Sequence, residues 1–201
     1  MNQYLYADYF KNVDVMSISS IVGLPISLFI AAVIVKISAK FGKKEVCVVG
    51  ILFAGAIYLV TFIMKTTNPW IFLIMNSIAL FGITAFNMLI WANITDIIDY
   101  NEVLTGKRND GAIYGLYSFS RKIGQALAGG LGGFALSFIG YNSLAAAQTT
   151  QVTDGIYTIA TIFPAICYII VGLIFIFAYP LNKNAVKANA AKLASIRNLK
   201  K

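Results

Sequence analysis

Histidine is absent from this 201-residue sequence, and cysteine occurs only twice, as Cys47 and Cys167. Both cysteines lie inside apolar runs, so the sequence offers neither a disulfide framework nor the Cys/His spacing of a zinc site. It also lacks a Ser-His-Asp or Cys-His arrangement. We therefore expect a protein that is not an enzyme, with no catalytic residue, no metal site and no cofactor. Both cysteines are interpreted as packing residues.

Charge is also scarce, because charged residues make up only 12% of the chain while hydrophobic residues make up 59%. The mean hydropathy of +0.76 is typical of a protein whose solvent is the lipid bilayer. The net charge of +8 could suggest nucleic acid, but the basic residues are dispersed over several loops rather than gathered on one soluble domain. We therefore expect a lipid bilayer and no nucleic acid as partner.

Five segments are long and apolar enough to cross a hydrocarbon core of about 30 Å as helices. They are residues 17–37, 45–64, 69–95, 112–139 and 155–179. None of them alternates with a period of two, so the pattern does not indicate a membrane barrel. The sequence predicts an all-α, polytopic membrane protein in which residues 1–181 form one transmembrane bundle and residues 182–201 form a basic tail.

Lysine and arginine concentrate in every second loop, namely after the first span, after the third span and in the C-terminal tail. The loop after the second span carries only Lys65, and residues 142–154 carry no basic residue. Because basic loops stay in the cytoplasm, we expect a multi-pass protein of the cell membrane with a cytoplasmic C-terminus and an outside N-terminus. An odd number of spans with an outside start suggests that an upstream segment is missing.

The tail places apolar residues at helical spacing among its basic residues. These apolar positions are Val186, Ala190, Leu193 and Ile196. One interpretation is a basic amphipathic helix on the anionic inner leaflet. The other is a disordered, solvated tail.

The third span carries its polar residues on one face. At 100° per residue, an arc of about 100° contains Asn76, Ser77, Thr84, Asn87, Trp91 and Thr95. This polar arc is poorly suited to lipid, so it either forms hydrogen bonds with neighbouring helices or lines a watery cavity. Trp91 favours a cavity, because an indole with nearby amides is a platform for a sugar ring. An interfacial tryptophan belt also explains it.

Two carboxylates follow this span, Asp96 and Asp99, and their spacing of i, i+3 places them side by side on the helix. Their simplest partners are Lys107, Arg108 and Arg121. A charge network between two helix ends can act as an inner gate that opens and closes during a transport cycle. The alternative is a static ion cluster at the membrane surface.

The fourth span has two possible starts. If the helix begins near Ala112, Lys122 lies about 15 Å inside it at 1.5 Å per residue and is a buried cation. If the membrane core begins at Ile123, Arg121 and Lys122 are ordinary inner flanks. A stripe with small residues surrounds the lysine, and Gln125 lies beside this stripe. Its members are Ser118, Lys122, Ala126, Gly129 and Gly133. Such a stripe lets another helix approach closely, which favours the first start.

The segment DIIDYNEVLTGKRNDGAIYGLYSFSRKIGQALAGGLGGFALSFIGYN, residues 96–142, resembles the signature of the glycoside-pentoside-hexuronide:cation symporters. This family is the branch of the major facilitator superfamily that includes melibiose permease. The matching positions are Asp96, Asp99, Tyr100, Glu102, Gly106, Arg108, Gly111, Tyr114, Lys122, Gly140 and Tyr141. The segments YADYFKNV and KISAKFGKK extend the resemblance over nearly the whole chain.

The resemblance implies that the five spans are helices 8 to 12 of a twelve-helix transporter, so the chain would be its C-terminal half or a truncated form. It implies sugar transport driven by a co-transported cation, a proton or sodium, through alternating access. The partner would be an N-terminal half that supplies the acidic groups. An alternative is a non-transporting membrane scaffold or a decayed remnant of such a transporter.

The resemblance also implies roles for particular residues. Lys122 matches the lysine near the cation and sugar sites, and we expect it to couple the two ligands. Asp96, Asp99 and Arg108 match the charged inner gate, to which we add Arg121 as a predicted partner. We expect a substrate site formed by Trp91, Asn87, Tyr117, Ser118, Lys122 and Gln125.

Overall fold

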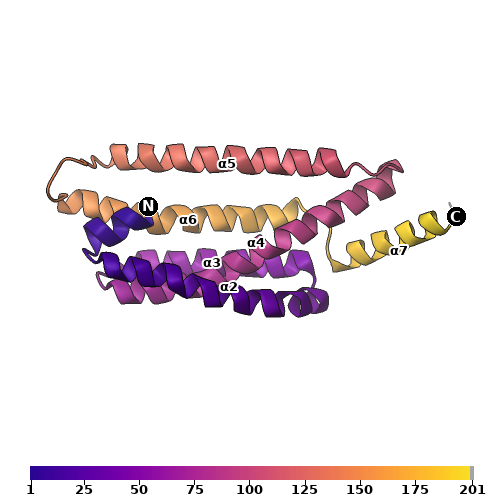
Figure 1. Cartoon of the computed structure of the whole chain (residues 1–201), viewed down its shortest axis with the longest axis horizontal. Coiled ribbons are helices and arrows are strands. Elements are labelled where there is room, and N and C mark those ends of the chain that lie inside the picture. Colours follow the sequence, from indigo (N-terminus) through magenta and orange to yellow (C-terminus); the bar gives the residue numbers. More distant parts are fainter. Residues whose placement is uncertain (200–201) are drawn as a thin grey trace.

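The computed structural model describes residues 1–199 and is all-helical over that range. A short N-terminal segment, α1 (Asn2–Tyr4) and η1 (Leu5–Tyr9), precedes five long helices. These are α2 (Val13–Phe41), α3 (Lys43–Met64), α4 (Pro69–Thr105), α5 (Asp110–Phe138) and α6 (Thr150–Phe177). The chain ends with α7 (Lys183–Leu199). The long helices run side by side, and α7 extends from one end of the bundle (Figure 1).

Each predicted span falls on one long helix. Within residues 1–199, four helices are long and apolar enough to cross a membrane, and these are α2, α3, α4 and α6. Helix α5 is not among them, because Arg121, Lys122 and several glycines lower its hydropathy, although its 29 residues exceed the length that a span requires. The predicted all-α, polytopic membrane fold is confirmed.

The helix ends follow local sequence signals. The side chains of Asn12, Asn68 and Thr149 each accept a hydrogen bond from a backbone N–H in the first turn of α2, α4 and α6 respectively, as N-caps do. Gly42 alone separates α2 from α3, and its φ of 108° is one that a residue with a Cβ rarely adopts. Helix α4 continues past the end of the predicted span at Thr95 and stops before Gly106, where φ is 70°.

Helices α2, α3, α4 and α6 form the packed part of the bundle, with α3 between α4 and α6. The backbones of α3 and α4 approach most closely at Gly50 and Gly82, where a Cβ added to Gly82 would collide with the Gly50 carbonyl. Small residues allow this kind of close contact between membrane helices. This close crossing of α3 and α4 adds to the buried apolar clusters that hold the bundle together.

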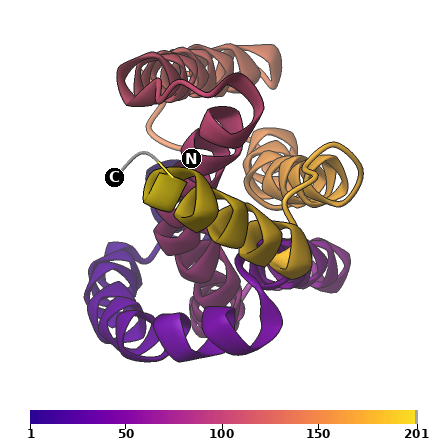
Figure 2. The same cartoon turned by 90° about the vertical axis from the view of Figure 1, so that its right-hand side faces the viewer.

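Helix α5 lies apart from the packed helices and is joined to the bundle mainly at its ends (Figures 1 and 2). Only Leu136 is buried among its residues, and that leucine belongs to an apolar cluster with η1 and α6. Seven α5 glycines have no atom within 4 Å of an added Cβ, Gly129 and Gly133 among them. Within the described residues, the predicted small-residue stripe is therefore left uncovered.

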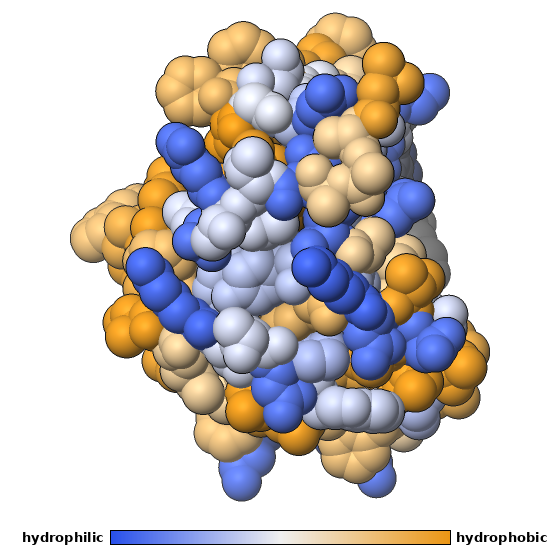
Figure 3. Space-filling view, turned by 90° about the vertical axis from the view of Figure 1, so that its left-hand side faces the viewer, coloured by the Kyte–Doolittle hydropathy of each residue, from blue (hydrophilic) through white to orange (hydrophobic). Residues whose placement is uncertain are grey.

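The two ends of the bundle differ in charge. Antiparallel connections place the α2–α3 turn, the α4–α5 loop and α7 at one end, which we call the basic end. The opposite end carries the N-terminal segment and the α5–α6 loop. It shows hydrophilic side chains across its middle and apolar side chains around its edge (Figure 3). This arrangement suits a bundle whose ends meet water and whose sides meet lipid.

The tail is helical from Lys183 to Leu199, so the alternative of a disordered tail is wrong for this segment. Leu193 of α7 is only 4% exposed, and α7 packs against the part of α4 beyond Thr95. The predicted apolar spacing therefore serves, at least at Leu193, to pack the tail on the protein. The predicted domain 182–201 also includes Lys200 and Lys201, which lie outside the described residues.

Candidate functional site

The basic end carries a charge cluster made of five ion pairs. The Lys43 Nζ lies 2.7 Å from the Asp96 carboxylate. The Arg108 guanidinium lies 2.9 Å from both Asp99 and Glu102 and 3.0 Å from Asp110. Arg197 of α7 lies 2.9 Å from Glu102. The hydrogen bonds that the Arg108 guanidinium donates to Glu102, Asp99 and Asp110 raise the pKa of Arg108, so it stays charged.

The structure corrects the predicted partner of one carboxylate. Asp99 pairs with Arg108 as expected, but Asp96 pairs with Lys43 rather than with a residue of the α4–α5 loop. The cause is the packing of α3 on α4, because the one-residue turn at Gly42 starts α3 with Lys43 directly beside Ala92 and Asp96 of α4. Lys43 lies 53 positions before Asp96, so local helix spacing gives no sign of this pair.

Arg121 also lies elsewhere than expected. It makes no ion pair among the described residues, and its guanidinium carbon lies 5.8 Å from the ring centroid of Trp91. This is the distance of a cation–π contact. The prediction that Arg121 pairs with Asp96 or Asp99 is wrong, and the side chain belongs to an aromatic groove between α4 and α5.

Seven residues line this aromatic groove, which has a volume of about 710 Å³. They are Phe86, Asn87, Ile90, Trp91, Tyr117, Ser120 and Arg121. The Trp91 ring meets Tyr117 edge-on with 5.0 Å between centroids, and Tyr114 lies 6.5 Å away. Ligand sites of small molecules have this size and combine aromatic walls with a few polar groups. Three of the predicted substrate residues, Asn87, Trp91 and Tyr117, thus come together here.

The other predicted substrate residues lie outside the groove lining. Ser118, Lys122 and Gln125 are all exposed on α5. At 100° per residue, these three positions are rotated about the α5 axis by about 40° to 140° from Tyr117 and Arg121, the two groove residues. They therefore lie on a neighbouring face of the helix. Helix α5 begins at Asp110, close to the first of the two predicted starts, whereas the position along it at which the hydrocarbon core begins stays a prediction. Lys122 therefore lies well inside a continuous helix.

The polar arc of α4 divides into two parts. Away from the basic end, Asn76 accepts a hydrogen bond of 2.7 Å from the Tyr58 hydroxyl of α3, and Thr84 is buried. Toward the basic end, Asn87 and Trp91 line the aromatic groove. Hydrogen bonding to a neighbouring helix therefore accounts for Asn76, whereas Asn87 and Trp91 lie on an open groove, for which water stays a prediction.

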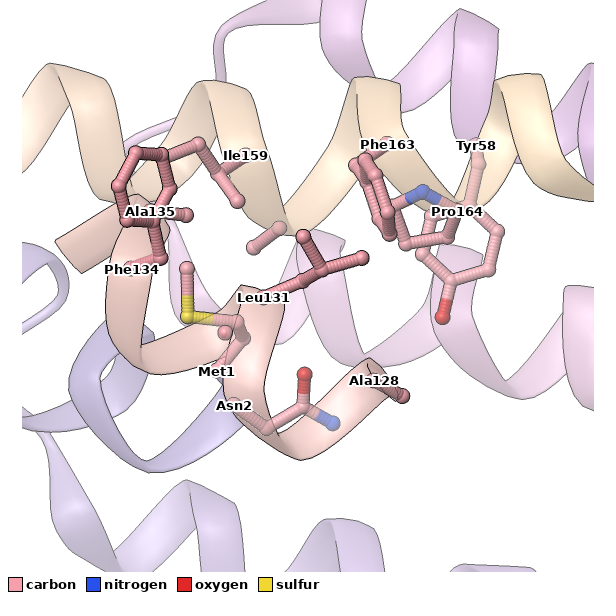
Figure 4. A pocket seen from close by; sticks show the side chains of 12 residues that line it. Met1, Asn2, Tyr58, Ala128, Leu131, Phe134, Ala135, Ile159, Phe163 and Pro164 are labelled. Atoms are coloured by element: carbon pink, nitrogen blue, oxygen red, sulfur yellow. The ribbon is translucent and has the colours of Figure 1, made fainter. Parts of the chain in front are cut away.

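A second cavity, of about 250 Å³, lies between α5 and α6. Side chains from α5, α6, α3 and the N-terminus surround it, including Leu131, Phe163 and Tyr58 (Figure 4). Its lining is almost entirely apolar, with Asn2 and the Tyr58 hydroxyl as the polar side chains. The cavity offers few groups that could orient a polar ligand, so the aromatic groove is the better candidate site.

Sequence reasoning missed several contributors to these sites, among them Glu102, Asp110 and Arg197 of the charge cluster and Phe86, Ile90 and Ser120 of the aromatic groove. Lys43 was not recognised as a partner of the charge cluster, and Tyr114 was not named as part of the site. A signal for Tyr114 was present, because Tyr114, Tyr117 and Arg121 fall within about 60° on one helix face at 100° per residue. No comparable local signal identifies Lys43.

Comparison with known proteins defines the family. Residues 1–183 match the family described as MFS/sugar transport protein, so the chain belongs to that family. The Uncharacterized symporter YjmB of Bacillus subtilis (strain 168) is 36% identical over 85% of this chain and 37% of its own length. The Glucuronide carrier protein homolog of Escherichia coli (strain K12) is 33% identical over 74% of this chain and 32% of its own length.

These matches confirm the resemblance to the glycoside-pentoside-hexuronide:cation symporters and the assignment as a multi-pass membrane protein. The family is one of sugar transporters rather than enzymes. The chain spans about a third of the length of the curated relatives it matches. What a complete transporter does is therefore a matter of proposal for this chain.

Proposed function

We propose that this chain forms part of a sugar:cation symporter that works by alternating access. The observation that carries the proposal is the aromatic groove, which places Trp91, Tyr117 and Asn87 around a ligand-sized space in a chain of a sugar-transport family. A tryptophan ring offers a flat apolar surface to a sugar, and nearby amide and hydroxyl groups provide hydrogen bonds.

Lys122 is proposed as the residue that couples cation and sugar. It is exposed on the open side of α5, among residues that nothing else in the described chain covers. A lysine at membrane depth costs about 2.5–3.5 kcal/mol on insertion scales unless it is paired or hydrated. The remaining region of the transporter would supply the acidic groups that complete this site, whether on the same polypeptide or on a separate one.

The charge cluster is proposed as the inner gate. It joins α3, α4, the α4–α5 loop and α7 through exchangeable ion pairs, with Glu102 shared between Arg108 and Arg197. Such a network can hold one conformation and rearrange in another. We place this basic end in the cytoplasm, because Lys and Arg concentrate in cytoplasmic loops.

The proposal is tested by sugar uptake into proteoliposomes that contain two polypeptides. One is this chain, and the other is the part of a relative's chain that has no counterpart in this chain. Uptake of a panel of sugars is measured with a sodium gradient, with a proton gradient and with neither. We expect accumulation that depends on one of the two gradients. Absence of uptake under every condition would refute transport, and equal uptake without a gradient would refute cation coupling.

The role of Lys122 is tested in the same assay with Lys122→Met. We expect loss of gradient-driven accumulation, because a neutral side chain cannot respond to the cation. The exposed loop residue Lys107 provides the matched control, since Lys107→Met removes a charge outside the proposed site. Unaltered gradient-driven uptake by Lys122→Met would remove this residue from the coupling mechanism.

A further inference from the structure

A third hollow, which we call the apolar groove, lies on the far side of α4 from the aromatic groove. It has a volume of about 580 Å³ and is lined by residues of α2, α3 and α4. At 100° per residue, its α4 residues Phe81, Gly82 and Ala85 lie about 160° around the helix from those that line the aromatic groove. Helices α2 and α3 are on the side of α4 opposite α5 (Figures 1 and 2). The apolar groove therefore opens on a side of the bundle that is remote from the proposed sugar site.

The apolar groove is hollow because two of its residues have no side chain. Gly50 and Gly82 lie at its base, where the backbones of α3 and α4 cross. Ile37 and Phe41 of α2 and Val49 of α3 form its walls, and all three are exposed. An empty hollow of this kind forfeits packing contacts, so on the side of a membrane protein it is filled by lipid or by another helix.

The apolar groove starts at the basic end, where the α2–α3 turn brings Phe41 and Glu45 together on its lining. From Glu45 to Gly50 it follows α3 for about 7.5 Å at 1.5 Å per residue. One leaflet contributes about 15 Å to a hydrocarbon core of about 30 Å. With the turn at the membrane surface, the groove accommodates the half of an acyl chain that is nearest its headgroup.

Lysines surround the open end of the apolar groove. Residues 36–45 contain four lysines and one acidic residue. Lys43 and Lys44 are bound to α4 and to the end of α6 respectively, whereas the Lys40 Nζ lies 5.3 Å from the centroid of the Phe41 ring. Because Phe41 lines the groove, the Lys40 ammonium lies at its mouth.

Two further side chains set the charge at this mouth. Lys36 is exposed one turn before Lys40 on the same face of α2. The Glu45 carboxylate accepts a hydrogen bond of 3.3 Å from the backbone N–H of Lys183, so it is directed at the start of α7. Lysines that flank a span need no ligand of their own. What indicates a ligand is their position beside an apolar hollow, at the depth of a lipid headgroup.

We propose that the apolar groove is a binding site for an anionic phospholipid. One acyl chain would lie along Phe41 and Val49, and the headgroup phosphate would bind the ammonium groups of Lys40 and Lys36. Such a lipid brings an apolar chain and a negative headgroup in the order in which the groove and its lysines present their counterparts. A zwitterionic lipid offers the same chain with a balanced headgroup and gains less from the lysines. The site is separate from the aromatic groove, so sugar uptake does not decide it.

The test is native mass spectrometry of the full chain in detergent micelles, titrated with one phospholipid at a time. The probes are phosphatidylglycerol, phosphatidylcholine and phosphatidylethanolamine with identical acyl chains, and inorganic phosphate. We expect one phosphatidylglycerol to bind about tenfold more tightly than either zwitterionic lipid, because two lysines face its headgroup. An excess of inorganic phosphate should not displace it, because the acyl chain supplies the rest of the affinity.

The variants separate the headgroup contact from the acyl-chain contact. Lys40→Gln should weaken phosphatidylglycerol binding about fivefold and leave phosphatidylcholine binding unchanged, while Lys192→Gln on α7 should match the parent. Val49→Trp places an indole in the groove and should weaken all three phospholipids by about tenfold. Its matched control is Val60→Trp, since Val60 is also exposed and lies on nearly the same face of α3, about three turns farther from the basic end. Equal helix content by circular dichroism shows that both tryptophan variants have stayed folded.

Each other outcome overturns the proposal. Equal affinity for all three lipids, unaffected by Lys40→Gln, refutes selection of an anionic headgroup, whatever the tryptophan variants do. Equal binding to Val49→Trp and Val60→Trp places the lipid outside the apolar groove. Displacement by inorganic phosphate reduces the site to one for a free anion. Loss of the bound lipid when the chain assembles with the remaining part of a relative shows that protein, rather than lipid, covers the groove.

Discussion

Removing the ammonium group of Lys43 should destabilise the bundle, because Asp96 would lose its ion-pair partner. The Asp96 side chain is 8% exposed and that of Lys43 is 33% exposed, with 2.7 Å between Nζ and the carboxylate oxygen. At an effective dielectric constant of about 20, two charges at this separation attract by about 6 kcal/mol. Desolvation of the carboxylate opposes much of this attraction.

The net cost lies between two known limits. Removing one partner of a fully buried pair costs about 3–5 kcal/mol, whereas an exposed pair contributes about 0–1 kcal/mol. Because Lys43 is one-third exposed, water screens part of the interaction. We therefore expect Lys43→Met to lower the free energy of unfolding by about 2 kcal/mol.

The assay is a denaturant titration of the chain in mixed micelles, followed by tryptophan fluorescence and circular dichroism. Lys43→Met, Asp96→Asn and the double variant form a double-mutant cycle, for which we expect a coupling energy of about 1–2 kcal/mol. Lys107→Met, in the exposed α4–α5 loop, should stay within about 0.5 kcal/mol of the parent. The reasoning would be refuted if the effects of Lys43→Met and Asp96→Asn on the free energy of unfolding were additive and Lys43→Met were as stable as Lys107→Met.

Two further variants address packing and the tail. Gly82→Ala should lower the unfolding free energy by about 1–3 kcal/mol, because the new Cβ meets the backbone of α3. The control is Gly124→Ala, which has open space around the new Cβ and should not lower it. Equal unfolding midpoints for the two variants would contradict the close helix crossing. Arg197→Gln should speed amide hydrogen exchange in α7, because it removes the ion pair to Glu102. Lys192→Gln is the matched control on the same helix, and identical exchange in both variants would show that the Arg197 pair does not hold α7.

Much of the fold could be predicted from the sequence, because span length and apolar composition report directly on the membrane environment. The five spans fall on the five long helices, and the start of α5 at Asp110 follows one of the two predicted possibilities. Asp96 and Asp99 were expected on the same helix beyond Thr95, but the continuation of α4 as far as Thr105 was not predicted, because charged residues form a helix in water as well as in the bilayer. The helix ends at Thr105, and the positive φ of the following Gly106 turns the backbone out of the helix.

The candidate site was predictable only where its residues share a helix face. Asn87 and Trp91 are one turn apart on α4, and the structure places both on the aromatic groove. The Lys43–Asp96 pair and the contact of Arg121 with Trp91 join different helices. Such contacts depend on the crossing of helices and on turn geometry, which residue spacing within one span does not encode.

The one-residue connection at Gly42 has a mechanical consequence. With no slack between α2 and α3, and with Lys43 fastened to α4 through Asp96, a tilt of any one of these helices drags the other two along. The longer connection at residues 139–149 imposes no such tether on the C-terminal end of α5, while Arg108 joins the N-terminal end of α5 to α4. A rocking movement would therefore carry α2, α3 and α4 together, while α5, which bears Arg121 and Lys122, could change its angle by pivoting at its N-terminal end.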